Sequence, residues 1–172
     1  MGFRGGIMAK MAVKGIDEYA LKLSKLGAKS SETAGKAIYA GAEVVADAIK
    51  QNIDGLETVD DKYNLIAYGK GKKSKLSKKQ KEGLKKSFGI TKMQKDSDGF
   101  YNVKLGFDGY NDIKTKKYPD GQPNQLIARI AESGSTFMDK TPFVRPALSK
   151  TKKQAQEAMQ KVIDVETEKI MK

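Results

Sequence analysis

The stretch ESGSTFMDKTPFVRPAL, residues 132–148, decides how the last third of the chain folds. Its two prolines, Pro142 and Pro146, bracket an apolar pair, Phe143 and Val144. A proline fixes its own φ, lacks an amide donor and disfavours the helical region for the preceding residue. We therefore expect Thr141 to be extended and to cap a helix with Pro142 in its first turn. The apolar pair at the start of that helix is predicted to dock it onto the body of the protein.

The pattern after this corner predicts one long helix from Pro142 to Ile170. The residues expected on its core-facing side are Leu148, Ala155, Met159, Val162, Ile163 and Ile170.

The first third of the chain predicts two amphipathic helices. The first runs from Gly15 to Leu26 and is expected to end at Gly27. The second runs from Ser30 or Ser31 to about Asn52, with an apolar face that comprises Ile38, Ala42, Val45, Ile49 and Ile53. Alanines and Gly41 on its other faces leave room for a helix or sheet to approach closely. Residues 1–11 are expected to be a disordered extension, because internal methionines follow at positions 8 and 11.

The middle of the chain predicts a small antiparallel sheet. Residues 84–93 and 100–107 are expected to be strands, joined by the turn at 94–99, which ends in glycine. Residues 108–124 are expected to form a long loop rich in turns. A short helix is expected at 126–131 and a third strand at 133–137. Residues 56–68 fit neither a helix nor a strand pattern. Helices on one face of such a sheet make an α+β domain over residues 12–172.

The charge is concentrated in one region. The net charge of +12 comes almost entirely from residues 62–95, which hold twelve lysines and one acidic residue. The run GKGKKSKLSKKQKEG, residues 69–83, has a single leucine, so it is expected to be a mobile loop that contributes little to the core. We expect that deleting it spares the fold.

The lysines of this region are the candidate contact residues, comprising Lys70, Lys72, Lys73, Lys75, Lys78, Lys79, Lys81, Lys85 and Lys86. They suit phosphate contacts with DNA, which are independent of sequence and sensitive to salt. They also suit an acidic partner protein, or a loop that only aids solubility, and we favour these two together over DNA contact. Arginine is absent from the run, and no aromatic residue interrupts it, which argues against base recognition and single-strand stacking.

Catalytic and metal sites are not predicted. The chain has no cysteine and no histidine, which removes thiolate chemistry, the commonest general base and the commonest metal ligand. The segment DGYND at 108–112 is similar to the start of a calcium loop but lacks the later glutamate, so a plain turn is expected. No apolar run reaches the roughly 20 residues of a membrane span. We expect no enzyme activity, no cofactor and no membrane contact.

The C-terminal stretch resembles the signature of a siphophage family of small tail-component proteins, also called neck, head–tail joining or tail-completion proteins. The matching residues are Glu132, Gly134, Thr136, Pro142, Phe143, Arg145, Pro146, Ala147 and Leu148. Upstream, the Leu84–Ser87 segment resembles the family's Leu-x-x-Ser at the start of its first strand. The chain departs from the family where Ser133 replaces the aromatic residue that more commonly precedes the glycine.

The resemblance implies a structural virion protein at the head–tail interface, made in the bacterial host cytoplasm. Its implied partners are the connector and the tail terminator or tail tube, with contact to genomic DNA as an open possibility. It also implies a ring of several copies in the particle, and we expect a monomer before assembly. The alternative is a basic nucleic-acid-binding accessory protein, which steeply salt-dependent binding to duplex DNA would favour.

Overall fold

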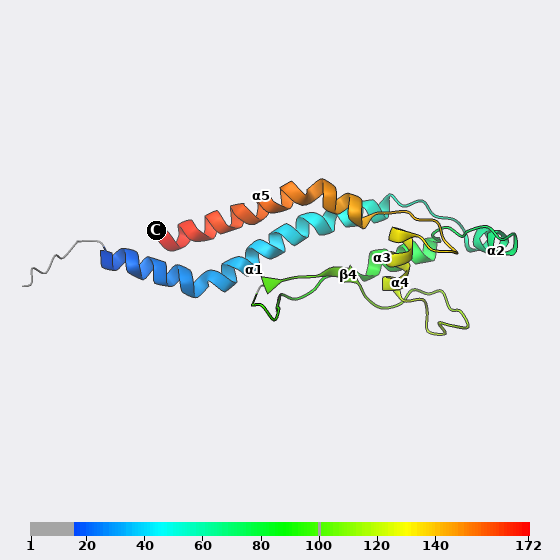
Figure 1. The fold of residues 1–172 in the computed structure, drawn as a ribbon, viewed down its shortest axis with the longest axis horizontal. Helices are drawn as coiled ribbons and strands as arrows, with labels where there is room; N and C mark the ends of the chain where they lie inside the picture. The colour runs from blue at the N-terminus through cyan, green and yellow to red at the C-terminus, as the bar shows by residue number, and fades with distance from the viewer. Residues whose placement is uncertain (1–15, 100) are drawn as a thin grey trace, which may run out of the picture.

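The computed structural model describes residues 16–99 and 101–172 and shows an elongated molecule (Figure 1). Two long helices, α1 (Ile16–Asp54) and α5 (Val144–Met171), lie side by side and antiparallel. The smaller elements gather beside and beyond the C-terminal half of α1. The predicted α+β class is confirmed. The expected disordered extension, and Phe100 at the start of a predicted strand, lie outside the described residues.

The predicted break at Gly27 is wrong, because α1 continues through it without interruption. A glycine inside a helix costs only about 1 kcal/mol, and the leucine and alanine beside it favour the helix. The predicted apolar face is confirmed in α1, where Val45, Ile49 and Ile53 are buried and Ile38 is half-buried.

Small residues bring α1 and α5 close together, as the sequence suggested. A Cβ atom placed on Gly41 would lie 2.7 Å from Met159 Cγ and 3.3 Å from the Ala155 carbonyl oxygen. Real Cβ atoms almost never approach another atom as closely as 2.7 Å. The absence of a side chain at Gly41 therefore allows the two helices to lie this close together beside Met159.

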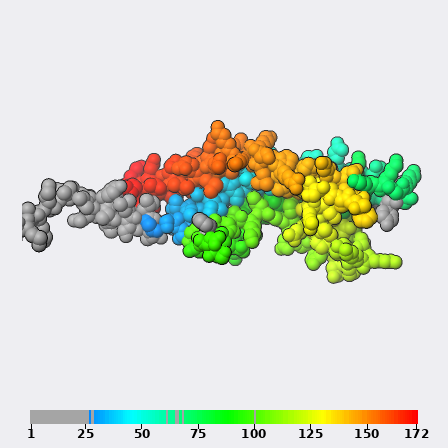
Figure 2. Space-filling view, viewed as in Figure 1, coloured from blue at the N-terminus to red at the C-terminus, as the bar shows by residue number. Residues whose placement is uncertain are grey.

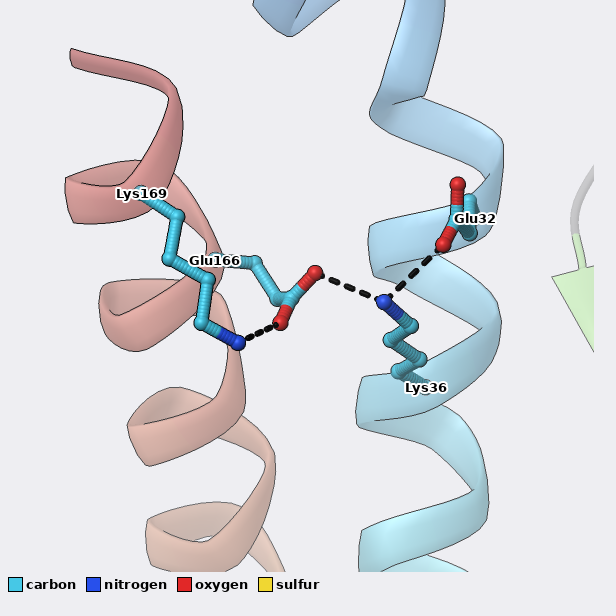
Figure 3. A network of polar contacts seen from close by, with 4 residues as sticks. All are labelled: Glu32, Lys36, Glu166 and Lys169. Carbon is cyan, nitrogen blue, oxygen red and sulfur yellow. Dashed lines mark hydrogen bonds and ion pairs between the residues drawn. The ribbon is translucent and has the colours of Figure 1, made fainter. Parts of the chain in front are cut away.

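A line of four charged residues joins the helices farther along (Figure 3). Lys36 on α1 lies 2.9 Å from Glu32 on its own helix and 2.8 Å from Glu166 on α5. Glu166 also lies 2.7 Å from Lys169. Hydrogen bonds from Lys169 and then Lys36 lower the pKa of Glu166 to about 2, and those from Glu166 and Glu32 raise the pKa of Lys36. Of these three contacts, the Lys36–Glu166 pair is the one that links the two helices.

The start and core face of α5 differ from the prediction. The helix begins at Val144, and two predicted core residues, Leu148 and Ile163, are exposed by 46% and 38%. Ala147 and Thr151 are buried instead. The Thr151 hydroxyl donates a 2.7 Å hydrogen bond to the Ala147 carbonyl, so a polar side chain can occupy the core.

The lysine-rich segment is more ordered than expected. Helix α2 (Asp61–Gly69) precedes it, and helix α3 (Lys78–Ser87) takes up its second half and the start of the predicted strand at 84–93. The prediction of a structureless loop over 69–83 is therefore wrong for residues 78–83. The reason is that Leu76 and Leu84 are fully buried, while the exposed lysines lie on the opposite side of α3.

A reciprocal cap starts α3. The Gln80 amide donates to the Ser77 hydroxyl at 3.3 Å, and the Ser77 amide donates to the Gln80 side-chain oxygen at 3.0 Å. The sequence Ser-Lys-Lys-Gln at residues 77–80 has the spacing of a capping box, but the lysine-rich composition led to the prediction of a loop. Deleting residues 70–83 would remove it together with the buried leucine, so the expectation that such a deletion spares the fold no longer holds.

The strands form two short antiparallel pairs. Strand β1 (Phe88–Ile90) pairs with β4 (Leu105–Phe107), and β2 (Gln94–Lys95) pairs with β3 (Tyr101–Asn102). The predicted antiparallel pairing around the turn is confirmed, with shorter strands than expected. The third strand predicted at 133–137 is absent, because helix α4 (Asn124–Ser133) reaches into it. That helix confirms the prediction for 126–131.

The core lies where these elements meet the C-terminal half of α1. It comprises Val45, Ile49, Ile53, Leu76, Leu84, Ile127, Ala128, Ala131, Phe143 and Ala147. Phe143 is only 1% exposed, and its ring packs edge-on against Phe107 with centroids 5.9 Å apart. The prediction that this aromatic residue docks α5 onto the body is confirmed.

Candidate functional site

The lysine-rich segment lies toward one end of the molecule, with α3 beside the C-terminal end of α1 (Figure 1). In Figure 2 the teal-green and yellow segments form this end together, so the lysine-rich segment and the chain around residues 130–140 are neighbours. The structure does not place the nine lysines in equivalent surroundings. Eight of them fall into three groups by what their ammonium groups contact, and Lys79 stands apart on α3.

Two of them hold the end of α1. The Lys81 ammonium donates to the Asp54 and Leu56 carbonyl oxygens at 2.9 and 2.8 Å, and the Lys85 ammonium lies 2.6 Å from the Asp54 carboxylate. The hydrogen bond to Asp54, reinforced by its charge, raises the pKa of Lys85. A cation at a helix C-terminus satisfies unpaired carbonyls and opposes the helix dipole. These two lysines are therefore part of the fold.

Three more lysines form exposed ion pairs within the chain. The distances are 3.6 Å for Lys73 with Asp139, 3.0 Å for Lys78 with Asp60 and 3.8 Å for Lys86 with Glu82. Exposed pairs of this kind contribute at most about 1 kcal/mol, so these lysines can exchange partners readily. Lys79 is exposed on the outer side of α3.

The remaining three, Lys70, Lys72 and Lys75, lie on the loop between α2 and α3. Their side chains are exposed and form no ion pair with the described part of the chain. Their backbone, in contrast, is held firmly. The Asn64 side chain donates to the Lys75 carbonyl at 2.9 Å and accepts from the Lys75 amide at 3.0 Å, and the Lys72 amide donates to the Ala67 carbonyl at 2.8 Å.

The C-terminal stretch holds the junction between α4 and α5 around one carboxylate. Glu132, in the last turn of α4, accepts hydrogen bonds from the amides of Phe143, Val144 and Arg145 at 2.8, 2.8 and 3.0 Å. Burial acts to raise the pKa of Glu132, but the three amides and the Arg145 guanidinium outweigh it and hold that pKa below its ordinary value. Glu132 thus caps α5 from another helix.

The predicted cap by Thr141 is wrong, because the N-cap residue is Phe143 and its own side chain makes no capping bond. The Thr141 amide instead donates to the Ala131 carbonyl at 2.7 Å, which ties the extended segment back to α4. Pro142 lies just before the helix rather than in its first turn. Pro146 lies within that turn, where its missing amide donor costs nothing.

The remaining motif residues shape the turn between α4 and this junction. Gly134 ends α4 with a φ of 76°, a conformation that favours glycine, and its amide donates to the Ile130 carbonyl at 2.7 Å. Arg145 and Thr136 are exposed, and the Arg145 guanidinium lies 3.7 Å from Glu132. The family-signature residues therefore build a helix junction and a surface turn, side by side.

The turn presents an aromatic residue that the sequence did not single out. Phe137 is 67% exposed, while the next residue, Met138, is buried. The Ser74 amide and hydroxyl both donate to the Phe137 carbonyl at 2.7 Å, which joins this turn to the lysine-bearing loop. In the sequence, the turn is marked by Gly134 and Ser135, two residue types that are common in turns. Nothing in the sequence indicates that the turn contacts Ser74.

The segment similar to a calcium loop forms a plain turn. The Asn124 amide donates to the Gly109 carbonyl and its side chain to the Asp108 carbonyl, both at 3.0 Å, so the segment is pinned to the start of α4. The described residues contain no group of three or more acidic, cysteine or histidine side chains placed to hold a metal. None of the helices within residues 16–99 and 101–172 combines the length and apolar character required to cross a membrane.

Comparison with protein families finds one that matches over residues 17–108, described as HK97-gp10-like bacteriophage tail components. The match spans α1 to β4, which is more than half of the chain, and it includes the Leu84–Ser87 segment but ends before the C-terminal signature. No curated protein and no solved structure matches the chain. The sequence resemblance to small phage tail components is confirmed over residues 17–108, and the protein belongs to the HK97-gp10-like family of bacteriophage tail components.

Proposed function

We propose that this tail component is a structural subunit of the head–tail interface, a neck or tail-completion protein that joins the connector to the tail. The observation that carries the proposal is family membership over α1 to β4, combined with the head–tail joining signature at the α4–α5 junction. The role is structural, requires no cofactor and places the protein in the virion after synthesis in the host cytoplasm. Its partners are the connector and the tail terminator or tail tube.

The surface is compatible with several copies arranged in a ring. Helix α5 exposes Leu148, Ile163 and Val165, by 46%, 38% and 43%. Side chains of this size on an otherwise charged helix lose contact with water when a neighbouring subunit covers them. A ring needs two different faces that meet between successive copies, and in this proposal the two sides of the α1–α5 pair supply them. In this proposal the free protein is monomeric and the ring forms on the connector.

A null allele of the gene tests the joining role. Thin-section and negative-stain microscopy of infected cells should show filled heads and separate tails, and the wild-type protein supplied in trans should restore joined particles. Normal joined particles in the absence of the protein would contradict the proposal.

The alternative, a nucleic-acid-binding accessory protein, is favoured by Lys70, Lys72 and Lys75, which form no ion pair with the described part of the chain. Of the other six, two hold the fold, three form exposed ion pairs within the chain, and Lys79 also has a partner. A fluorescence titration with duplex DNA distinguishes the alternatives. Tight binding would favour the alternative if the logarithm of the association constant falls steeply as the logarithm of the salt concentration rises.

A further inference from the structure

We propose that Phe137 and the adjacent lysines Lys70, Lys72 and Lys75 form a preorganised docking tip for an acidic protein surface with an apolar pocket. The pocket takes the Phe137 ring, and carboxylates around it meet the lysines. This inference rests on the proposed function, because the partner is a neighbouring protein of the head–tail interface. The four residues are called the basic tip below.

The turn that carries Phe137 is held by its own hydrogen bonds. The Ser135 hydroxyl accepts from the amides of Phe137 and Met138 at 3.1 and 3.0 Å, and the Ser135 amide donates to the Met138 carbonyl at 2.9 Å. Met138 is buried and anchors the turn, whereas the Phe137 ring points away from the core with 67% of its surface exposed. The backbone position of the ring is therefore fixed before any partner arrives.

Hydrogen bonds join the loop that carries the lysines to the turn that carries Phe137. The Ser74 amide and hydroxyl both reach the Phe137 carbonyl, and the Asp139 amide donates to the Ser74 carbonyl at 3.3 Å. On its other side the loop is held by Asn64 of α2, through both hydrogen bonds to Lys75. Since fixed backbone saves ordering entropy on association, the basic tip is suited to bind without a folding step.

The chemistry of the tip favours a protein over DNA. Residues 69–75 and 134–140 together hold five lysines and one aspartate, so an acidic surface is the complementary one. Phosphates of a duplex would engage the lysines but offer nothing to an exposed phenylalanine. Protein interfaces, in contrast, use an aromatic anchor in a pocket and leave strongly hydrated lysines at the rim. An exposed phenylalanine joined to a lysine-bearing loop matches that arrangement.

The test uses heads and tails purified separately from a phage that lacks the gene. Purified wild-type protein and a Phe137→Ala variant are added, and the bound fraction is measured by cosedimentation with each particle. Tyr110→Ala is the matched control, because Tyr110 is 64% exposed on a different turn. A combined Lys70→Glu, Lys72→Glu and Lys75→Glu variant tests the rim, and thermal unfolding confirms that every variant is folded.

The proposal predicts that Phe137→Ala weakens particle binding by at least about tenfold, that the lysine variant does the same in a salt-dependent manner, and that Tyr110→Ala binds as the wild type. Wild-type binding by Phe137→Ala would overturn the docking tip and leave the joining role intact. Failure of the wild-type protein to bind either particle would count against the joining role itself. If Phe137→Ala instead loses affinity for a single-stranded oligonucleotide while particle binding is unchanged, the ring stacks on bases and the protein partner is wrong.

Discussion

The carboxylate of Glu132 lies 2.8 Å from the backbone nitrogen of Phe143 and so fastens the start of α5 to the end of α4. The same carboxylate caps the next two amides of the helix. Phe143 is buried at the same place. The hydrogen bonds to Glu132 and the packing of the Phe143 ring therefore hold the same corner of the fold. The corner sets where the long helical pair leaves the body of the protein.

Replacing Glu132 should destabilise this corner. Glu132→Ala leaves three helix-start amides without their acceptor and is expected to lower the free energy of unfolding by about 2–3 kcal/mol. Glu132→Gln keeps an acceptor oxygen but loses the charge, so a loss of about 1 kcal/mol is expected. Urea denaturation provides the measurement. Glu157→Gln, an exposed change on α5, is the control and should have almost no effect.

Two phenylalanines six residues apart should respond in opposite ways to truncation. Phe143→Ala removes a ring that is 1% exposed and should cost about 3–5 kcal/mol of unfolding free energy. Phe137→Ala removes a ring that is 67% exposed and should change it by less than about 0.5 kcal/mol. Thermal and urea unfolding provide the measurement. If the two substitutions lower the stability by the same amount, the two rings are not placed as described.

Two glycines of α1 form a second matched pair. Gly41→Ala places a Cβ against Met159 and should destabilise the protein by about 1–3 kcal/mol, because the helices must separate or the side chain must move. Gly27→Ala meets no atom within 4 Å and should stabilise the helix by up to about 1 kcal/mol. A Gly41→Ala protein that regains stability when Met159→Ala is added would identify the contact responsible.

The pKa of Glu166 should be measurable as a reporter of the α1–α5 register. The value of about 2 lies below the ordinary glutamate value of about 4.3, so the folded state favours the carboxylate. Its contribution to stability is therefore complete above that ordinary value and is lost as the pH falls toward 2. In an NMR titration of the side-chain carboxyl carbon, Lys36→Gln should raise the pKa. The control Lys50→Gln, which removes a lysine paired with Asp47, should leave it unchanged.

The lysine-rich segment should tolerate loss of charge but not loss of chain. Neutralising Lys70, Lys72 and Lys75 to glutamine is expected to change the unfolding free energy by less than about 0.5 kcal/mol. Deleting residues 70–83 removes buried Leu76 and the Ser77–Gln80 cap and should cost more than about 3 kcal/mol. A deletion variant with an unchanged melting temperature would restore the earlier expectation of a dispensable loop.

The sequence predicted best where one residue decides the local outcome. Phe143 between two prolines correctly predicted a buried corner, and the spacing of Val45, Ile49 and Ile53 correctly predicted the buried face of α1. The lysine run misled because composition does not show which residues face inward. The buried ones are Leu76 before α3 and Gln80, Gly83 and Leu84 within it. The cap of α5 by Glu132 was out of reach, because it depends on a side chain eleven residues away meeting the amides in space.

The candidate site shows the same limit. The sequence indicated the lysines as a class, but only the structure separates Lys81 and Lys85, which hold α1, from the three on the outer loop. It did not indicate Phe137 at all, because exposure depends on the Ser74 contact across 63 residues of chain. Long-range pairing of this kind leaves no local pattern.

The most direct test of the central claim is a reconstruction of the assembled particle by electron cryomicroscopy at a resolution that traces helices. The account predicts several copies of the α1–α5 pair in a ring between the connector and the tail, with each Phe137 seated on a neighbouring protein. Density for this chain at the distal end of the tail, or its absence from the purified particle, would contradict the proposed place at the head–tail interface.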